Sequence, residues 1–151
     1  MADESKSSNK QGINQDLARA LPRLTTEQVA EVSPKFIRVT YAPGEIIIRQ
    51  DDLPERFYIV IRGRVEVVHE GQSGRTHTVN VRGPGEYFGE IGLLHNSPRS
   101  ATVRAAAEGE VEVLALDRQA FKELIDDSRA TEAQVALEMT QRLIHLADFQ
   151  S

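Results

Sequence analysis

The segment that decides the fold spans residues 83–103 and reads GPGEYFGEIGLLHNSPRSATV. A glycine-rich turn leads into a short helical stretch and then into a Pro-Arg loop. Gly89 lets the backbone approach a ligand closely, because glycine has no side chain. A helical turn over residues 90–94 would direct unpaired N–H groups toward that ligand, and Arg99 can bind anionic oxygens through its planar guanidinium. The segment therefore predicts a phosphate site.

Glu90 indicates that the ligand is more than a phosphate. A carboxylate beside an anion is repulsive, unless the ligand also carries hydroxyl groups that donate hydrogen bonds to it. A ribose hydroxyl is such a donor. The glycine, the acid and the arginine together therefore indicate a sugar phosphate.

Short strands lie on both sides of this segment. Apolar and polar residues alternate in residues 37–41 and 76–81, and glycine-proline turns follow each of them. Turn signals recur about every eight to twelve residues, which predicts a mainly β fold, an antiparallel β-barrel or jelly roll. The other expected strands are at residues 45–48, 57–61, 65–67, 87–88, 101–105 and 111–116.

Helices are expected before and after the strands. Thr25 and Gln28 have the spacing of a capping box that opens a helix, and a leucine face precedes them. Asp117 is the predicted N-cap of a further helix, and a longer one follows from about residue 131. The 151 residues fit one domain. We divide the chain into a disordered tail (1–12) and a domain (13–151) with N-terminal helices (13–35), a β-barrel (36–116) and C-terminal helices (117–149).

Residues 88–103, FGEIGLLHNSPRSATV, resemble the phosphate-binding cassette of cyclic nucleotide-binding domains. This family includes the regulatory subunits of cAMP-dependent kinase, cyclic nucleotide-gated channels and the catabolite activator protein. The flanking stretches YAPGEIIIRQ, FYIVIRGRVEV and VEVLALDRQAF resemble the family in the same order, so that the likeness covers roughly residues 17–149.

The resemblance implies a role for most cassette residues. Glu90 matches the acid that takes the ribose 2′-hydroxyl, and Arg99 matches the arginine that pairs with the cyclic phosphate. The Gly89 backbone would approach the sugar, and the Ala101 N–H would face the phosphate. The other residues implied to bind the ligand are Ile91, Gly92 and Ser100.

The same resemblance predicts the ligand and its response. The expected ligand is cAMP, with cGMP as the alternative, because a hydroxyl at Ser100 can reach either the phosphate or a guanine amino group. Val81 and Leu93 are expected in the apolar wall around the base. Arg142 and Leu146 of the last helix are the predicted lid residues, whose movement would switch the protein.

Two positions depart from the family pattern. Asp51-Asp52 stands where many relatives have glycine followed by an acid, which bears on the geometry of that loop. Gly92 stands where alanine is common, and this loosens the cassette helix by up to about 1 kcal/mol. Neither change removes a contact to phosphate or ribose.

Composition excludes several other functions. The formal net charge of −5 argues against direct nucleic acid binding, which depends on releasing counterions from many phosphates. The chain has no cysteine, which fits a reducing cytoplasm. The sequence contains no run of some eighteen apolar residues, so it predicts no membrane span. We therefore expect a cytoplasmic protein or the cytoplasmic domain of a membrane protein.

Sequence motifs for catalysis are missing as well. The four histidines show no metal-ligand spacing and include no His-x-His pair, which weakens a cupin-like enzyme as an alternative. Neither Ser97 nor Ser100 lies in a Gly-x-Ser-x-Gly turn. We expect no enzyme, no metal and no cofactor. A scaffold of the same fold that binds no nucleotide is the other alternative.

The output of the switch is left open by the sequence. No helix-turn-helix or kinase inhibitor segment is visible, so we expect a fused or separate effector. The chain would be a sensor domain of a larger bacterial transporter, channel or enzyme, or a module that acts through a partner. A homodimer through the C-terminal helix, at Val135, Met139 and Phe149, is a further expectation.

Overall fold

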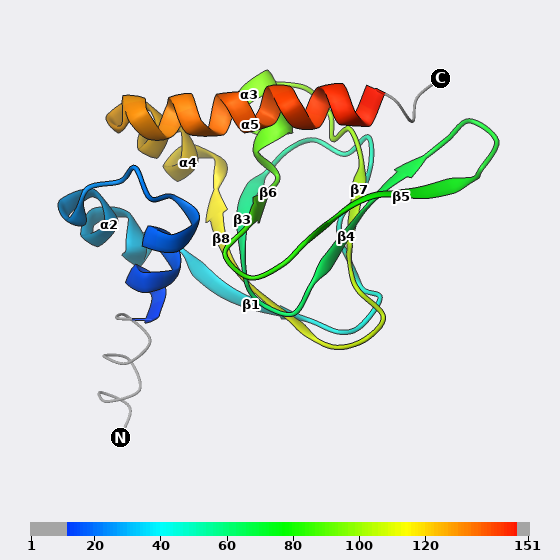
Figure 1. Cartoon of the computed structure of the whole chain (residues 1–151), viewed down its shortest axis with the longest axis horizontal. Helices are drawn as coiled ribbons and strands as arrows, with labels where there is room; N and C mark the ends of the chain where they lie inside the picture. The colour runs from blue at the N-terminus through cyan, green and yellow to red at the C-terminus, as the bar shows by residue number, and fades with distance from the viewer. Residues whose placement is uncertain (1–11, 148–151) are drawn as a thin grey trace.

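Residues 12–147, the part of the chain that the computed structural model describes, contain eight strands in two antiparallel sheets (Figure 1). One sheet has the strand order β1-β8-β3-β6, and the other has the order β2-β7-β4-β5. The strands are β1 (Ile37–Tyr41), β2 (Ile46–Ile48), β3 (Arg56–Arg62), β4 (Val65–Glu70), β5 (Thr76–Arg82), β6 (Tyr87–Phe88), β7 (Thr102–Ala105) and β8 (Val111–Asp117).

The expected mainly β fold with flanking helices is confirmed, and each predicted strand is present. The two sheets pack as a jelly roll, but they do not close into a barrel, because no strand pairing in residues 12–147 joins them. The predicted tail lies outside the described residues except for residue 12, which is helical. Residues 148–151, which include the predicted end of the last helix, lie outside them too.

The helices follow their predicted capping signals. Residues 12–20 are helical, and Thr25 and Gln28 form the expected capping box. Asp117 accepts a hydrogen bond from the backbone of Ala120 at 2.9 Å, as an N-cap does. The other helical elements are α2 (Thr26–Val32), the 3-10 turn η1 (Ser33–Lys35), α3 (Glu90–His95), α4 (Arg118–Asp127) and α5 (Arg129–Ala147).

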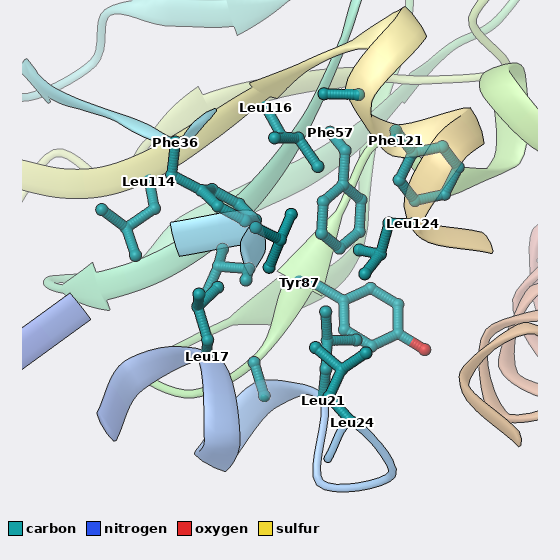
Figure 2. Close-up of a cluster of buried hydrophobic side chains, with 14 of the residues drawn as sticks. Leu17, Leu21, Leu24, Phe36, Phe57, Tyr87, Leu114, Leu116, Phe121 and Leu124 are labelled. Carbon is teal, nitrogen blue, oxygen red and sulfur yellow. The ribbon is translucent and has the colours of Figure 1, made fainter. Parts of the chain in front are cut away.

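A cluster of buried aromatic and aliphatic side chains joins the helices to the β1-β8-β3-β6 sheet (Figure 2). Phe57 of β3 is fully buried, and its ring centroid lies 4.8 Å from that of Phe121 on α4 and 5.5 Å from that of Tyr87 on β6. Leu17 and Leu21 of the N-terminal part cover the same cluster. Because β6 leads directly into the cassette, this core fixes where the cassette begins.

Helix α5 contacts both α3 and α4 and runs along one end of the two sheets, at the top of Figure 1. Val135 lies in its first half and is 0% exposed, because it packs into the main core. The predicted dimer seam is therefore wrong for Val135, which has no free surface, and Phe149 lies outside the described residues. Within residues 12–147 no helix combines the length and apolar character that crossing a bilayer requires.

Phe57→Ala is predicted to lower the free energy of unfolding by about 3–5 kcal/mol, because it empties the centre of the core. Urea denaturation followed by circular dichroism measures this. The control is Leu53→Ala, since Leu53 is 74% exposed and its loss should change stability by no more than about 0.5 kcal/mol. Equal effects of the two changes would show that Phe57 does not organise the core.

Candidate functional site

A pocket opens between strand β5, the cassette and helix α5. Its cavity volume is about 70 Å³, which is smaller than that of most small-molecule sites. Its wall contains all of the cassette residues predicted to bind the ligand and both predicted lid residues: Gly89, Glu90, Ile91, Gly92, Arg99, Ser100, Ala101, Arg142 and Leu146.

Arg99 is a buried cation in the wall of this pocket, only 6% exposed. Its Nη1 donates to the carbonyl oxygen of Gly89 and its Nη2 to that of Arg56, both at 2.6 Å. Burial lowers the pKa of the Arg99 guanidinium, and the nearby Tyr58 and Glu90 oppose this shift. The guanidinium keeps further N–H donors that these carbonyls do not use. Its position is therefore fixed while it can still bind an anion.

The loop before β3 holds the backbone of Arg99. The N–H of Asp51 donates to the carbonyl oxygen of Arg99, and the N–H of Arg99 donates to that of Asp52, both at 2.8 Å. Asp51 has a φ of 75°, in the left-handed region where glycine is preferred and aspartate is tolerated. The departure from the family pattern therefore keeps the backbone conformation that glycine would give.

Gly89 and Gly92 bring the cassette close to its neighbours. Gly89 has a φ of 91°, and a Cβ there would lie 3.0 Å from the carbonyl oxygen of Arg56. A Cβ on Gly92 would lie 2.9 Å from the Cβ of Pro54. The close packing of α3 against this loop thus explains why residue 92 is a glycine. The sequence alone indicated only that this glycine weakens the helix.

Glu90 is the acid of the pocket and is 1% exposed. Its Oε1 accepts a hydrogen bond from Nη1 of Arg142, which reaches down from α5. The Arg142 guanidinium also lies 4.7 Å from the centre of the Tyr87 ring, a cation–π distance. The second carboxylate oxygen, Oε2, is buried and has no hydrogen-bond partner among the described residues. Glu90 can therefore still accept a hydrogen bond from a ligand.

Part of the pocket wall is apolar. Val79, Ala101 and Leu146 form a small buried cluster, with Val67 packed against it. These side chains come from β5, the cassette, α5 and β4, so the cluster closes when the helix is in place. Such a surface suits a flat, largely apolar ring system.

Two predicted wall residues are wrong. Val81 is 41% exposed and does not line the pocket, which Val79 lines instead. In the β4–β5 ladder Val67 pairs with Asn80 and Val68 with Thr78, so Val79 is an extra, bulged residue. A bulge changes the direction in which side chains point. The prediction assumed regular alternation, in which Val79 and Val81 point to the same face of the sheet.

Leu93 is the second wrong wall residue. It lies in a separate surface groove between α3 and α4 and packs against the main core. In an α-helix a residue two positions away points in a direction roughly 200° around the axis. Ile91 lines the pocket, so Leu93 faces away from it.

Three further polar residues of the pocket wall were not predicted: Asn80, Arg82 and His145. Arg82 at the end of β5 lines the pocket and is buried. His145 of α5 is also in its wall and lies 2.7 Å, through Nε2, from the carbonyl oxygen of Val79. Arg82 directly precedes the glycine-rich turn, where a charged residue indicates surface, so only the strand register could have revealed it.

The pocket as a whole can bind an anion at Arg99, a hydroxyl at Glu90 and an apolar ring against Val79, Ala101 and Leu146. Residues 12–147 contain no group of three or more histidine and acidic side chains placed to hold a metal ion. The arrangement is that of a binding site for a small phosphorylated ligand.

Comparison with protein-family models matches residues 38–128 to the cyclic nucleotide-binding domain. The match includes the cassette and most of both sheets. This chain belongs to the cyclic nucleotide-binding domain family. It is a cyclic nucleotide-binding regulatory domain, similar to PKA regulatory subunits and to catabolite activator protein.

Curated relatives of this cyclic nucleotide-binding domain are much longer proteins. The chain is 38% identical over 113 residues to an uncharacterized ABC transporter ATP-binding protein of Mycobacterium tuberculosis, covering 70% of this chain and 33% of that protein. It is 43% identical over 89 residues to the cAMP-dependent protein kinase regulatory subunit of Dictyostelium discoideum, and this match covers 57% of this chain and 27% of that protein. The chain therefore spans about a third or less of these relatives.

Solved structures support the same fold. The regulatory domain of Toxoplasma gondii PKA, crystallised with cAMP, has a TM-score of 0.82 and 23% identity, over 91% of this chain and 52% of that one. The catabolite activator protein of Thermus thermophilus has a TM-score of 0.71 and 31% identity, and the match covers 87% of this chain and 60% of that one.

Gly92→Ala is predicted to lower the free energy of unfolding by about 1 kcal/mol. Overpacking against Pro54 costs roughly 1–3 kcal/mol and outweighs the gain of up to about 1 kcal/mol in helix propensity. Chemical denaturation measures the change. The control is Gly109→Ala, where a Cβ meets nothing within 4 Å. A stabilised Gly92→Ala variant would contradict the close packing of α3 on the loop.

Proposed function

We propose that this chain is a cyclic nucleotide sensor, with cAMP as its ligand and cGMP as the alternative, and that it catalyses no reaction itself. The observation that carries the proposal is the buried Arg99 guanidinium, which the carbonyls of Gly89 and Arg56 hold in place. It shares its pocket with a buried carboxylate oxygen of Glu90 that lacks a partner. A ligand that carries both an anion and a hydroxyl satisfies both groups.

A cyclic phosphate fits these two groups better than an open one does. Its ring fixes the phosphate relative to the sugar hydroxyl, so that both can be bound without ordering a flexible ligand. Arg99 would take the phosphate, and Glu90 would accept the 2′-hydroxyl, as the family resemblance implies. Gly89 lines the same pocket without a side chain, and Ser100 and Ala101, whose N–H groups would bind the phosphate, directly follow Arg99 in the chain.

The base would lie at the apolar part of the pocket wall, against Val79, Ala101 and Leu146. Support for adenine comes from the relatives, which include cAMP-dependent kinase regulatory subunits and structures that contain cAMP. Ser100 also lines the pocket, and its hydroxyl keeps cGMP as the alternative ligand.

Binding would be coupled to α5 through two contacts. Arg142 holds Oε1 of Glu90, the same carboxylate that would receive the ribose hydroxyl, and Leu146 forms part of the base wall. A ligand therefore changes what both residues of the helix contact. A ligand shifts a conformational equilibrium only through such a difference in affinity between the two states.

The output would come from another domain or protein. Relatives of this chain are named as an ABC transporter ATP-binding protein and as kinase regulatory subunits, and the chain spans only part of each. We place it in the cytoplasm, as a regulatory module fused to or bound by such an effector, with no direct contact to nucleic acid. A homodimer through α5 would use residues other than Val135, which is fully buried.

Arg99→Ala is predicted to weaken cAMP binding at least about 100-fold, since hydrogen bonds to a charged group contribute roughly 1.5–3 kcal/mol each. Calorimetric titration with cAMP, cGMP and 5′-AMP measures this and ranks the purines. The matched control is Arg75→Ala, which removes an exposed arginine from the β4–β5 hairpin. If wild-type protein takes up neither cyclic nucleotide, the proposal is wrong and the chain is a scaffold of the same fold.

Replacing Arg142 and Leu146 together by alanine is predicted to weaken cAMP binding and to abolish the movement of α5. Because the chain has no cysteine, spin labels at Gln141→Cys and Glu110→Cys, both exposed positions, report the distance from α5 to the sheet. Adding cAMP should change this distance in the parent protein and not in the double variant. An unchanged affinity together with the same distance change would refute the lid role.

A further inference from the structure

Arg82 is a second buried arginine in the pocket, only 8% exposed. Its Nε atom is buried and has no hydrogen-bond partner among the described residues. A buried donor without a partner destabilises a protein by roughly 1–3 kcal/mol, and by more when the group is charged. Such a donor in the wall of a binding site is satisfied when a ligand supplies an acceptor.

The strand register explains why Arg82 points inward. It pairs with Val65 of β4, which is fully buried. Cross-strand partners lie on the same face of a sheet, so the Arg82 side chain enters the interior although a glycine-rich turn follows it. The bulge at Val79 lies between Arg82 and the exposed start of β5.

The charges around Arg82 identify the part of the pocket that it serves. Burial lowers the pKa of its guanidinium, Arg142 lowers it further, and Glu90, Glu86 and Glu138 oppose the shift. Arg82 and Arg142 therefore both act on the buried carboxylate of Glu90. Arg142 already holds Oε1, so the buried unsatisfied atoms among the residues that line the pocket are Oε2 of Glu90 and Nε of Arg82.

Resting on the proposed function, we propose that Arg82 is a second binding residue for the ribose 2′-hydroxyl. The hydroxyl donates its proton to Oε2 of Glu90 and accepts a hydrogen bond from the Nε–H of Arg82. A single hydroxyl can do both, because it has one donor and two acceptor lone pairs. A second phosphate would satisfy Arg82 but would repel Glu90, so the group bound here is neutral. Arg82 thereby adds to the preference of Glu90 for a ribose over a deoxyribose.

The test compares cAMP with 2′-deoxy-cAMP by calorimetric titration. Wild-type protein should bind the deoxy ligand about 100-fold more weakly, because two buried charged groups then lose their partner. In Arg82→Leu only Glu90 senses the hydroxyl, so the ratio of the dissociation constants of 2′-deoxy-cAMP and cAMP should fall to about tenfold. Arg82→Gln, which keeps a polar group of smaller size, should give a reduced ratio too. Arg75→Leu, a loss of the same charge from the exposed hairpin, should keep the wild-type ratio.

Each outcome has a separate meaning. If Arg82→Leu and Arg82→Gln melt like the wild type and bind cAMP but keep its ratio, Arg82 does not contact the hydroxyl and this inference is overturned. If only Arg82→Leu fails to fold, the ratio of Arg82→Gln decides. If the wild type binds no cyclic nucleotide at all, the proposed function itself fails, and this inference fails with it.

Discussion

The buried guanidinium of Arg99 is the group on which the site depends. The carbonyls of Gly89 and Arg56 hold it from the side-chain end, and two hydrogen bonds to the loop at Asp51 and Asp52 hold its backbone. Each partner imposes a condition on the chain. Gly89 must adopt a positive φ, Asp51 must do the same, and α3 must lie against the loop. The contacts of this one buried cation therefore hold the cassette, the start of β3 and the loop at Asp51 together.

Helix α5 connects this site to the rest of the fold. Its first half is anchored in the main core, where Thr131 and Val135 are fully buried. Its second half covers the pocket through Arg142 and Leu146. A helix that is fixed at one end and contacts the site at the other has the placement that the proposed coupling requires.

Much of this could be predicted from the sequence. Strand alternation, the turn glycines and the caps at Thr25 and Asp117 are local signals, and the structure follows them. The cassette residues carry the family pattern and do line one pocket. Features that depend on register were missed. Whether Val79 or Val81 faces the pocket depends on a bulge, and Arg82 points inward because its partner strand is buried. No single-strand pattern contains that information.

The most direct test of the account is a crystal structure of this chain grown with cAMP. The account predicts the cyclic phosphate within hydrogen-bond distance of Arg99, with the bonds from Arg99 to the carbonyls of Gly89 and Arg56 still in place, and the ribose against Glu90. A nucleotide bound elsewhere on the protein, or an Arg99 that leaves these carbonyls to reach the phosphate, would contradict the claim that the fold positions this cation in advance.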